Sequence, residues 1–526
     1  MLDQEWSENL DCYPFVPPFT GEPGLHIPDG VDTPYDFLRL FITDDMLLTL
    51  KRETNRYAAK QIEAVGNAAA PFSIYSLWKP VTLNEMRGFF VILLHMSLLD
   101  KPRLSDYWNT SPIVMSQFAG NIMGRDRFMQ ILSFLHISDD TNYRPYGEPG
   151  HHPLAKLEPV YSTLRATFQS LYTPERKVSI DEAVCPWRGR LRFRVYMKDK
   201  PHKWGIKLYE LCESSSGYVY DFEVYAGIPG LSNRPVDVCK RLMTPLLHKG
   251  YVLFTDNYYT CPELVDDLAA DDTMCVGTVR ANRVGMPKDL VNMNLATGEV
   301  SFRRRQQVVA LKWQDKKPVH LLTTVHDPRR YVTVTTRTTT KDKPEAIQDY
   351  VLNMSGVDRS DQLMAYNPFR RRSVKWWKKL FFHLFTMCSV QAQILHNKSM
   401  RARQGKTMNL VEFLISAGNA MAEDYVAKRL QDRAQPNNGA QAEAVSLNRL
   451  TARHFPKWLP PTPQKEHPFR VCFVCSARKR KAGQPLGAAP TNRQRKETQF
   501  WCEPCGKALC PAPCFEIFHT KKDYLL

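Results

Sequence analysis

Apolar and polar residues in the first third of the chain recur with the spacing of α-helices. Thr33, which is followed by a proline, has the pattern of a helix N-cap with proline at the first helical position. Thr82 and Glu85 form a capping-box pattern at the start of a strongly apolar segment. These features predict a helical region over residues 32–176, after an irregular, proline-rich leader at 1–31. The apolar residues that support it lie in Gly88–Leu99, Gly124–His136 and Leu157–Leu171.

Near Lys177 the pattern changes to short runs of strand-forming residues. Ser214–Gly217 has the composition of a hairpin turn, and Pro262–Leu268 suits a short helix. Strands followed by an alternating helix and strand predict a mixed α/β sheet covered by helices, over residues 177–280. The strand-like runs are Lys177–Asp181, Arg192–Tyr196, Lys203–Cys212, Tyr218–Tyr225, Tyr251–Asp256 and Met274–Val279.

The rest of the chain divides into four further segments. Residues 281–345 contain strand-like runs with basic residues around them, which predicts a β-rich insertion into the α/β core. Residues 346–367 return to a helical pattern as the second part of that core, and residues 368–458 form the second part of the helical region. A proline-rich spacer then introduces a cysteine-rich module at 459–526. The predicted fold class is therefore mixed, α+β.

Composition narrows the classes of function. The 526 residues are 43% hydrophobic and 11% aromatic, as in globular proteins, and the formal net charge is +17. A strongly basic chain favours a nucleic-acid partner. The N-terminal residues lack the pattern of a signal peptide, and the longest apolar run is too short to cross a bilayer. We therefore expect no membrane association.

Four aspartates are candidates for a divalent-metal site. Asp181 and Asp256 each end a run of strand-forming residues. Asp358 and Asp361 are three residues apart at the start of a predicted helix, so they share one face of it. An aspartate at a strand end is also a common turn residue, but two Mg²⁺ or Mn²⁺ ions held by carboxylates are what phosphodiester cleavage and joining require. In a basic chain these acids predict metal-dependent chemistry on a nucleic acid.

A second candidate nucleic-acid contact is Phe369–His383, where cations and aromatic residues are interleaved. Cations neutralise phosphates, and an aromatic ring stacks on an unpaired base with about 1–3 kcal/mol. One of Trp376 and Trp377 could stack on a base while the other anchors the helix in the core. The cations expected to contact DNA are Arg370, Arg371, Arg372, Lys375 and Lys378.

The crowded cysteines of the C-terminal module predict two zinc sites. Their spacing is that of metal ligands, and the scattered cysteines elsewhere indicate a reduced chain. Two tetrahedral sites need eight ligands, and the six cysteines with His519 offer seven. His454 is the best candidate for the eighth, with His467 as its rival, and this ligand would complete an interleaved cross-brace. The basic run Arg478–Lys481 could contact phosphates or act as a nuclear localisation signal. The other candidate ligands are Cys472, Cys475, Cys502, Cys505, Cys510, Cys514 and His519.

From about residue 33 onward, the chain closely resembles the piggyBac family of DNA transposases, in motifs that follow the family's order. Its nearest likeness is to the transposon-derived members found in animal genomes. The motifs are Ser179–Ala183, Trp187–Arg190, Lys200–Tyr209, Phe254–Thr260, Asn353–Gln362 and Cys510–His519.

The resemblance implies an RNase H-like catalytic core with an insertion domain, and a split helical domain for dimerisation and DNA binding. It implies a catalytic triad of Asp181, Asp256 and Asp358, with Asp361 as a further acid near the metals and Trp376 as the active-site tryptophan. The family cuts through a hairpin intermediate and inserts at TTAA sequences. We therefore expect a cut-and-paste transposase that acts on double-stranded DNA as a homodimer in the nucleus, with two Mg²⁺ per active site and two Zn²⁺ in the C-terminal module.

Two other functions are compatible with the same residues. A domesticated DNA- or chromatin-binding protein would keep the fold and the zinc module without transposing. A metal-dependent nuclease would share the acids but nick DNA without joining strands. All four acids are present, which favours the enzyme.

Overall fold

The computed structural model divides into two compact units, residues 1–434 and 435–526, which we describe separately. No helix in the ranges described is long and apolar enough to cross a membrane. The described residues are 5–8, 15–66, 70, 73–198, 200–335, 340–369, 373–434, 454–462, 465–476, 496–503 and 505–521.

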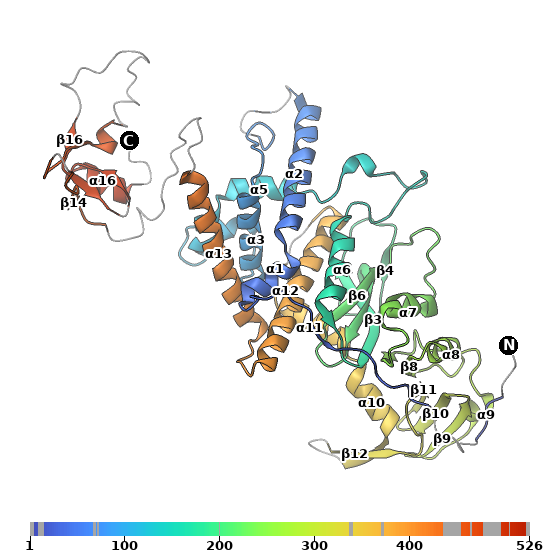
Figure 1. Ribbon diagram of the computed structural model, residues 1–526. Coiled ribbons are helices and arrows are strands. Elements are labelled where there is room, and N and C mark those ends of the chain that lie inside the picture. Colours follow the sequence, from blue (N-terminus) through green and yellow to red (C-terminus); the bar gives the residue numbers. More distant parts are fainter. Residues whose placement is uncertain are drawn as a thin grey trace. The chain divides into compact units, whose positions relative to one another are not determined.

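Helices form the first part of the larger unit, as the apolar spacing predicted. The Thr33 hydroxyl accepts a hydrogen bond from the Asp36 N–H, and the Asp36 carboxylate accepts one from the Thr33 N–H, so a capping box starts the first helix. Thr82 and Glu85 do the same for α3 (Leu83–Leu98). The helix capped by Thr33 is α1 (Pro34–Phe41). The other helices before the sheet are α2 (Asp44–Val65), η2 (Leu104–Trp108), α4 (Gln117–Ile122), α5 (Arg125–Phe134), η3 (Asp140–Asn142) and α6 (Val160–Leu171) (Figure 1).

A nine-stranded mixed sheet forms the centre of this unit. Its strands are β3 (Lys177–Pro186), β4 (Arg194–Tyr196), β5 (Trp204–Glu213), β6 (Val219–Val224), β7 (Val252–Thr255), β8 (Met274–Thr278), β9 (Val300–Arg305), β10 (Val308–Gln314) and β11 (Pro318–Thr323). The order is β4-β5-β3-β7-β8-β11-β10-β9, with β6 also paired to β5. The central strand β3 pairs antiparallel with β5 and parallel with β7. The described part of the leader adds β1 (Gly24–Leu25), which pairs with β2 (Tyr172–Thr173).

The two faces of the sheet are covered by different helices, because successive residues of a strand point to opposite sides. Val178 and Ile180 of β3 share a hydrophobic core with helices α7 and α8. Ala183 shares the other core with α6 and α11, and α11 contacts both β3 and β5. The predicted acids of β3 and α11 therefore lie at the second face. These helices are α7 (Pro235–Met243), α8 (Pro262–Ala270), α10 (Glu345–Asn353) and α11 (Gly356–Tyr366).

Residues 281–345 are rich in strands, as expected, but three of these strands extend the core sheet instead of forming a sheet of their own. Leu322 of β11 is the register partner of Gly277 of β8, which joins β9, β10 and β11 to the rest. The strands β12 (Tyr331–Thr335) and β13 (Thr340–Pro344) form a separate hairpin, and α9 (Lys288–Asn292) precedes β9. The predicted insertion is thus partly continuous with the core.

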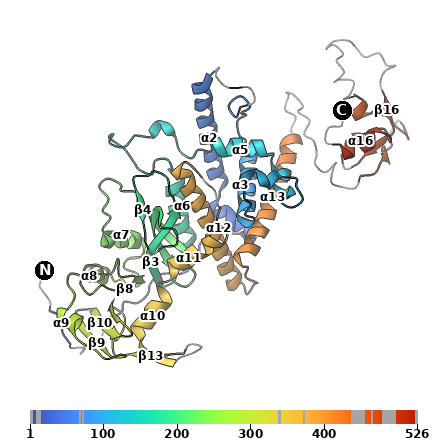
Figure 2. The ribbon, with the colours of Figure 1, turned by 180° about the vertical axis from the view of Figure 1, so that it is seen from behind.

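Two helices after the sheet complete the bundle that the first helices begin. Helix α12 (Trp376–Ala402) contacts α1, and α13 (Leu410–Ala434) contacts both α1 and α3 (Figures 1 and 2). Phe90 of α3 packs on Phe385 of α12 with ring centroids 5.3 Å apart. Gly88 of α3 faces Tyr425 of α13 so closely that a Cβ would lie 2.7 Å from its ring. The predicted split helical region is therefore one packed body.

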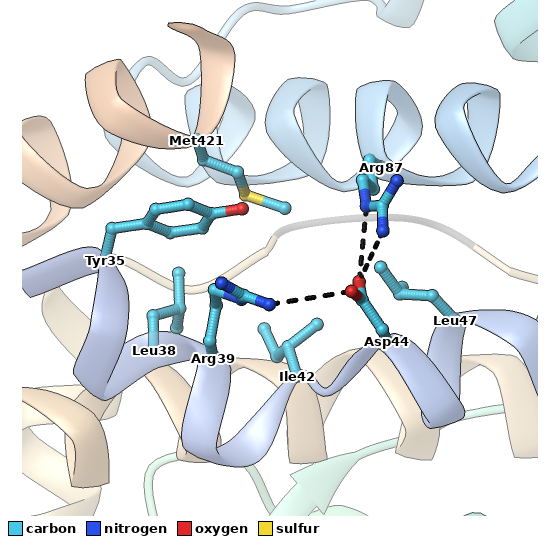
Figure 3. A pocket seen from close by; sticks show the side chains of 8 residues that line it. All are labelled: Tyr35, Leu38, Arg39, Ile42, Asp44, Leu47, Arg87 and Met421. Atoms are coloured by element: carbon cyan, nitrogen blue, oxygen red, sulfur yellow. Dashed lines mark hydrogen bonds and ion pairs between the residues drawn. The ribbon is translucent and has the colours of Figure 1, made fainter. Parts of the chain in front are cut away.

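Two cavities of this unit lie away from the predicted acids. One of about 10 Å³ is a gap among α1, α2, α3 and α13, where Asp44 makes ion pairs with Arg39 and Arg87 (Figure 3). It is too small for more than a water molecule. Another of about 540 Å³ is lined by Lys177 and Val252, at the amino ends of β3 and β7. Asp181, in the middle of β3, and Asp256, directly after β7, line neither cavity.

The described part of the C-terminal unit consists of short strands and short helical segments around buried cysteines. Trp458 of its first strand pairs with Phe500, and Trp501 pairs with Ala508, which makes a three-stranded sheet. Its elements are β14 (Lys457–Trp458), β15 (Arg470–Val471), β16 (Glu497–Thr498), β17 (Phe500–Cys502), β18 (Lys507–Ala508) and α16 (Cys514–Thr520).

Candidate metal centres

The parallel pairing of β3 and β7 brings two of the predicted acids side by side. Ile180 of β3 is the register partner of Thr255 of β7, so the next residues, Asp181 and Asp256, follow side by side where this pairing ends. Asp256 comes directly after β7, whereas β3 continues to Pro186, so the prediction that Asp181 ends its strand is wrong. Asp181 accepts a hydrogen bond of 2.8 Å from the N–H of Glu182. Asp256 accepts one of 2.9 Å from the N–H of Tyr258. Local backbone hydrogen bonds therefore orient both carboxylates.

Helix α11 carries the other two acids and packs closely on the sheet. At its first residue, Gly356, a Cβ would lie 2.4 Å from the Oγ of Ser179, so only a glycine allows this approach. Asp358 in the first turn is exposed, and Asp361, three residues later, is half-buried. The spacing puts both on one side of the helix.

Crowding raises the pKa values of three of these acids. Burial, then a hydrogen bond with Glu182, raises the pKa of Asp181 to about 8. Burial raises the pKa of Asp361 to about 6, opposed by the charge of Lys200 and reinforced by that of Asp358. Burial also raises the pKa of Asp256. A divalent cation would favour the charged form of each group, and a donor set of carboxylate oxygens fits Mg²⁺ or Mn²⁺.

Two lysines lie close to these acids, and each has a carboxylate partner. Lys207 donates to Glu182 at 2.8 Å. Lys200 Nζ lies 3.8 Å from Asp358 Oδ1. Although burial lowers the pKa of Lys200, the charges of Asp181, Asp361 and Asp358 raise it above its usual value. Lys200 is thus paired with Asp358 and also interacts electrostatically with Asp181 and Asp361.

Sequence reasoning missed two members of this region. The Tyr350 hydroxyl of α10 accepts a hydrogen bond of 3.1 Å from Thr278, and burial raises the pKa of Tyr350 to about 12, with Asp256 and Asp181 adding to the rise. Glu210 of β5 is the register partner of Asp181 and is fully buried. Burial, then the charge of Asp361, raises the pKa of Glu210 well above its usual value. A glutamate between Tyr209 and Leu211, in a buried part of the strand, was the available signal.

The four aspartates do not close around one point. In the parts of the chain that the structure describes, His, Cys, Asp or Glu ligand atoms gather in groups of three or more, within 4.8 Å of one another, only in the C-terminal unit. Like charges that share no cation repel each other. The acids are therefore gathered on one face of the sheet in an open arrangement.

The adjacent tryptophans at the start of α12 have different surroundings. Trp377 is 4% exposed and meets the ring of His136 edge-on at 5.1 Å, so it is the tryptophan that anchors the helix in the core. Trp376 is half-buried and meets Phe193 edge-on at 5.1 Å. Trp376 therefore keeps an accessible part, whereas Trp377 would have to leave the core to reach a base.

The cations predicted to contact DNA are not equivalent. Arg370, Arg371 and Arg372 lie outside the described residues. Lys375 is half-buried and donates to the Tyr57 hydroxyl at 3.1 Å. Lys378 is buried, and its Nζ donates to the carbonyls of Leu132 and Ser133 in the last turn of α5. Burial lowers the pKa of Lys378 to about 7. This placement argues against the predicted phosphate contact of Lys378, because its ammonium already satisfies the end of a helix.

The candidate zinc ligands form two groups, and in each group the ligand atoms lie within 4.8 Å of one another. Cys475 Sγ and Cys514 Sγ are 3.5 Å apart. Two thiolates on a tetrahedral zinc, at about 2.3 Å from the metal, stand about 3.8 Å apart. Because the groups alternate along the chain, the two sites interlock in the predicted cross-brace. The groups are His454, Cys502, Cys505 and His519, and Cys472, Cys475, Cys510 and Cys514.

The histidines are oriented for metal binding. His519 Nδ1 donates to the Phe515 carbonyl at 2.7 Å, which directs Nε2 toward Cys505 Sγ, 3.6 Å away. His454 presents Nδ1 at 3.1 Å from Cys502 Sγ. His467, its rival, lies beside the ring of Trp458 and is in neither group. The structure therefore selects His454 as the eighth candidate ligand.

Comparison with known proteins gives a consistent match. The family model described as "Transposase IS4" matches residues 33–393. The human "PiggyBac transposable element-derived protein 3" is 24% identical over 400 residues, which are 72% of this chain and 63% of that protein. The human "PiggyBac transposable element-derived protein 5" is 23% identical over 406 residues, 72% of this chain and 74% of that protein. The chain therefore matches less than two thirds of the length of the first of these relatives.

A solved structure shares the fold. It is titled as a piggyBac transposase synaptic complex with hairpin DNA, and it is 20% identical, with a TM-score of 0.68, over 93% of this chain and 97% of that one. This match confirms the predicted mixed fold of a central sheet with flanking helices.

Proposed function

Because the chain belongs to the piggyBac-type branch of the Transposase IS4 family, we propose that it is a cut-and-paste DNA transposase. It hydrolyses phosphodiester bonds at the ends of a DNA element and joins the freed ends to target DNA. Two observations carry this proposal: the pairing of β3 with β7 sets Asp181 beside Asp256, and helix α11, which bears the other two acids, packs on β3. Cleavage through a hairpin and insertion at TTAA sites are part of the proposal through the family resemblance.

The proposed holders of two Mg²⁺ or Mn²⁺ ions are Asp181, Asp256 and Asp358, with Asp361 as a further ligand. The ions, when bound, stabilise charge on the entering and leaving oxygens of the phosphodiester. The backbone N–H groups of Glu182 and Tyr258 keep two of the carboxylates oriented. Lys200, beside Asp358, supplies a positive charge near the phosphate that reacts.

DNA contacts are proposed for three parts of the chain. Trp376 is half-buried at the start of a helix, where its accessible part stacks on a base that unpairs near the cleaved end. Lys375, beside it, contacts phosphates once DNA displaces its bond to Tyr57. The zinc module binds the element end. We further propose that the chain works as a homodimer in the nucleus, as the family resemblance implies.

The acids provide the decisive test. Asp181→Asn, Asp256→Asn and Asp358→Asn should each abolish Mg²⁺-dependent cleavage of DNA that carries the gene's own flanking sequences. Affinity for that DNA should change by less than about twofold, because cations and aromatic rings supply the binding. The matched control is Asp349→Asn, whose carboxylate pairs with Lys177 and His326 at the amino end of β3. It should lower stability but retain cleavage. Wild-type rates in Asp256→Asn would remove that residue from the site.

A domesticated DNA-binding role is the second candidate, because the matched human relatives are named as derived from transposable elements. The two functions differ in excision. A plasmid that carries a marker between the native flanking sequences loses the marker if the chain transposes. Binding to these sequences without excision, by a protein that holds metal at the four aspartates, would favour the domesticated role.

A further inference from the structure

One carboxyl group beneath α11 has no hydrogen-bond partner among the residues that the structure describes. Glu210 of β5 is fully buried, and neither of its carboxylate oxygens has a hydrogen-bond partner among the described residues. Buried carboxyl groups in folded proteins are nearly always hydrogen-bonded, paired with a cation or bound to a metal. Glu210 therefore differs from an ordinary core residue.

Strand register determines where this carboxyl group points. Glu210 is the direct antiparallel partner of Asp181, so the two Cβ atoms are about 5 Å apart on the same face of the sheet. Cys212, two residues later, lies on that face as well, because a Cβ at Gly356 of α11 would be 3.3 Å from its Cβ. The carboxyl group of Glu210 is thus enclosed between the strand of Asp181 and the helix of Asp361.

Glu213, at the end of the same strand, is a buried carboxylate that does have hydrogen-bond and ion-pair partners. It is equally buried, but it accepts hydrogen bonds from the Tyr172 hydroxyl and from the Glu175 N–H and pairs with Lys398 at 2.8 Å. Glu210 has none of these. The contrast lies in the partners and not in the burial.

We propose that Glu210 is a fifth carboxylate of the divalent-metal site, which holds an ion shared with Asp181 and Asp361 directly or through a metal-bound water. This rests on the proposed metal-dependent function and adds a ligand to its site. Oxygen donors of this kind suit Mg²⁺ and Mn²⁺, and the ion supplies the direct partner that the Glu210 carboxyl group lacks among the described side chains.

Metal binding without DNA tests the assignment. The zinc-loaded full-length chain is titrated with Mn²⁺, bound ion is followed by electron paramagnetic resonance, and melting temperatures are recorded in EDTA. Glu210→Met, which keeps the side-chain length and removes the charge, should weaken Mn²⁺ binding at least about tenfold. Its melting temperature in EDTA should stay or rise, because an unpaired buried carboxyl has been removed.

Two further variants make every outcome decisive. Glu213→Gln should lower the melting temperature in EDTA and leave Mn²⁺ affinity within about twofold, since it breaks a paired carboxylate outside the site. Asp181→Asn reports on the site itself. If it weakens Mn²⁺ binding and Glu210→Met does not, Glu210 is an ordinary buried acid and the inference is overturned. If neither weakens it, the proposed metal site fails as well. Should Glu210→Met melt below the wild type in EDTA, Glu210→Gln is titrated in its place against the same threshold.

Discussion

Gly356 at the start of α11 lies so close to Ser179 of β3 that a Cβ on the glycine would be 2.4 Å from the serine Oγ. The same Cβ would come within 3.2 Å of the carbonyl oxygen of Glu213. The helix is therefore seated on the sheet with no room for a side chain. This contact sets the distance at which Asp358 and Asp361 stand from Asp181.

Gly356→Ala should therefore displace α11 and lower DNA cleavage about 100-fold, although every acid is retained. Single-turnover cleavage, together with Mn²⁺ affinity, measures the effect. The matched control is Gly124→Ala at the start of α5, where a Cβ meets nothing within 4 Å, and it should cleave like the wild type. Equal rates in the two variants would show that the close approach does not position the acids.

Metal-free protein should lose stability as the pH rises. Burial raises the pKa of Asp181 in the folded state to about 8, whereas the ordinary pKa of an aspartate is 3.8. Folding therefore binds a proton in this window, and the free energy of unfolding falls as pH rises through it. In EDTA, the melting temperature from pH 5 to 8 should fall by at least about 2 °C more for the wild type than for Asp181→Asn. Excess Mg²⁺ should remove this difference in slope, because it holds the carboxylate ionised in the folded state. Parallel curves in EDTA would mean that Asp181 ionises normally.

Substitution of the two tryptophans of α12 should impair different properties of the protein. Trp376→Ala should impair hairpin formation or opening more than first-strand nicking, because a base needs its stacking platform only once the duplex is distorted. Trp377→Ala should instead cost about 3–5 kcal/mol of stability, because it empties a buried site beside His136. Nicking and hairpin yields on gels, with melting temperatures, separate the two. The opposite pattern would reverse their roles.

The C-terminal unit should contain two zinc ions per chain, detectable by elemental analysis. Cys502→Ala removes a ligand from one group, and because the two groups interlock along the chain it should unfold the whole module and weaken binding of the element end. The larger unit should keep its melting temperature. Cys239→Ala, a buried cysteine of that unit, is the control and should keep both ions. Disulfides among these cysteines in native protein would contradict the zinc sites.

Local signals explain what could be predicted from the sequence. Thr33 and Thr82 cap their helices through neighbours three residues away, and Asp181 and Asp256 follow runs of strand-forming residues. Glu210 has no such signal of function, because its meaning depends on its pairing with Asp181, which the strand pattern alone does not specify. A charged residue between apolar strand residues shows only that an explanation is needed.

The remaining differences between the predictions and the structure also depend on contacts between residues far apart in the sequence. The strand-forming runs of residues 281–345 could be recognised in the sequence. The pairing of β11 with β8, which extends the core sheet, could not. Helix α7 was not predicted, although Pro235 at its first turn was a usable signal. Lys378 was expected to contact DNA because it lies in a cationic helix start. That pattern does not reveal that α5 packs against this lysine. His454 rather than His467 completed the metal group only once the chain was folded.

The passage from α11 into α12 has a consequence for protein engineering. Asp358 and Asp361 stand on a helix whose successor, α12, is packed against α1 in the helical bundle. A fragment that ends before α12 would remove one of the elements that pack on this helix and leave mainly its contacts with the sheet. In a chimaera of two relatives, the core sheet would come from one protein and the helices from the other. Helix α11 would then contact a sheet and a helix α12 that do not come from the same protein. The smallest exchangeable cassette is therefore the whole first unit, residues 1–434, while the zinc module can be traded separately.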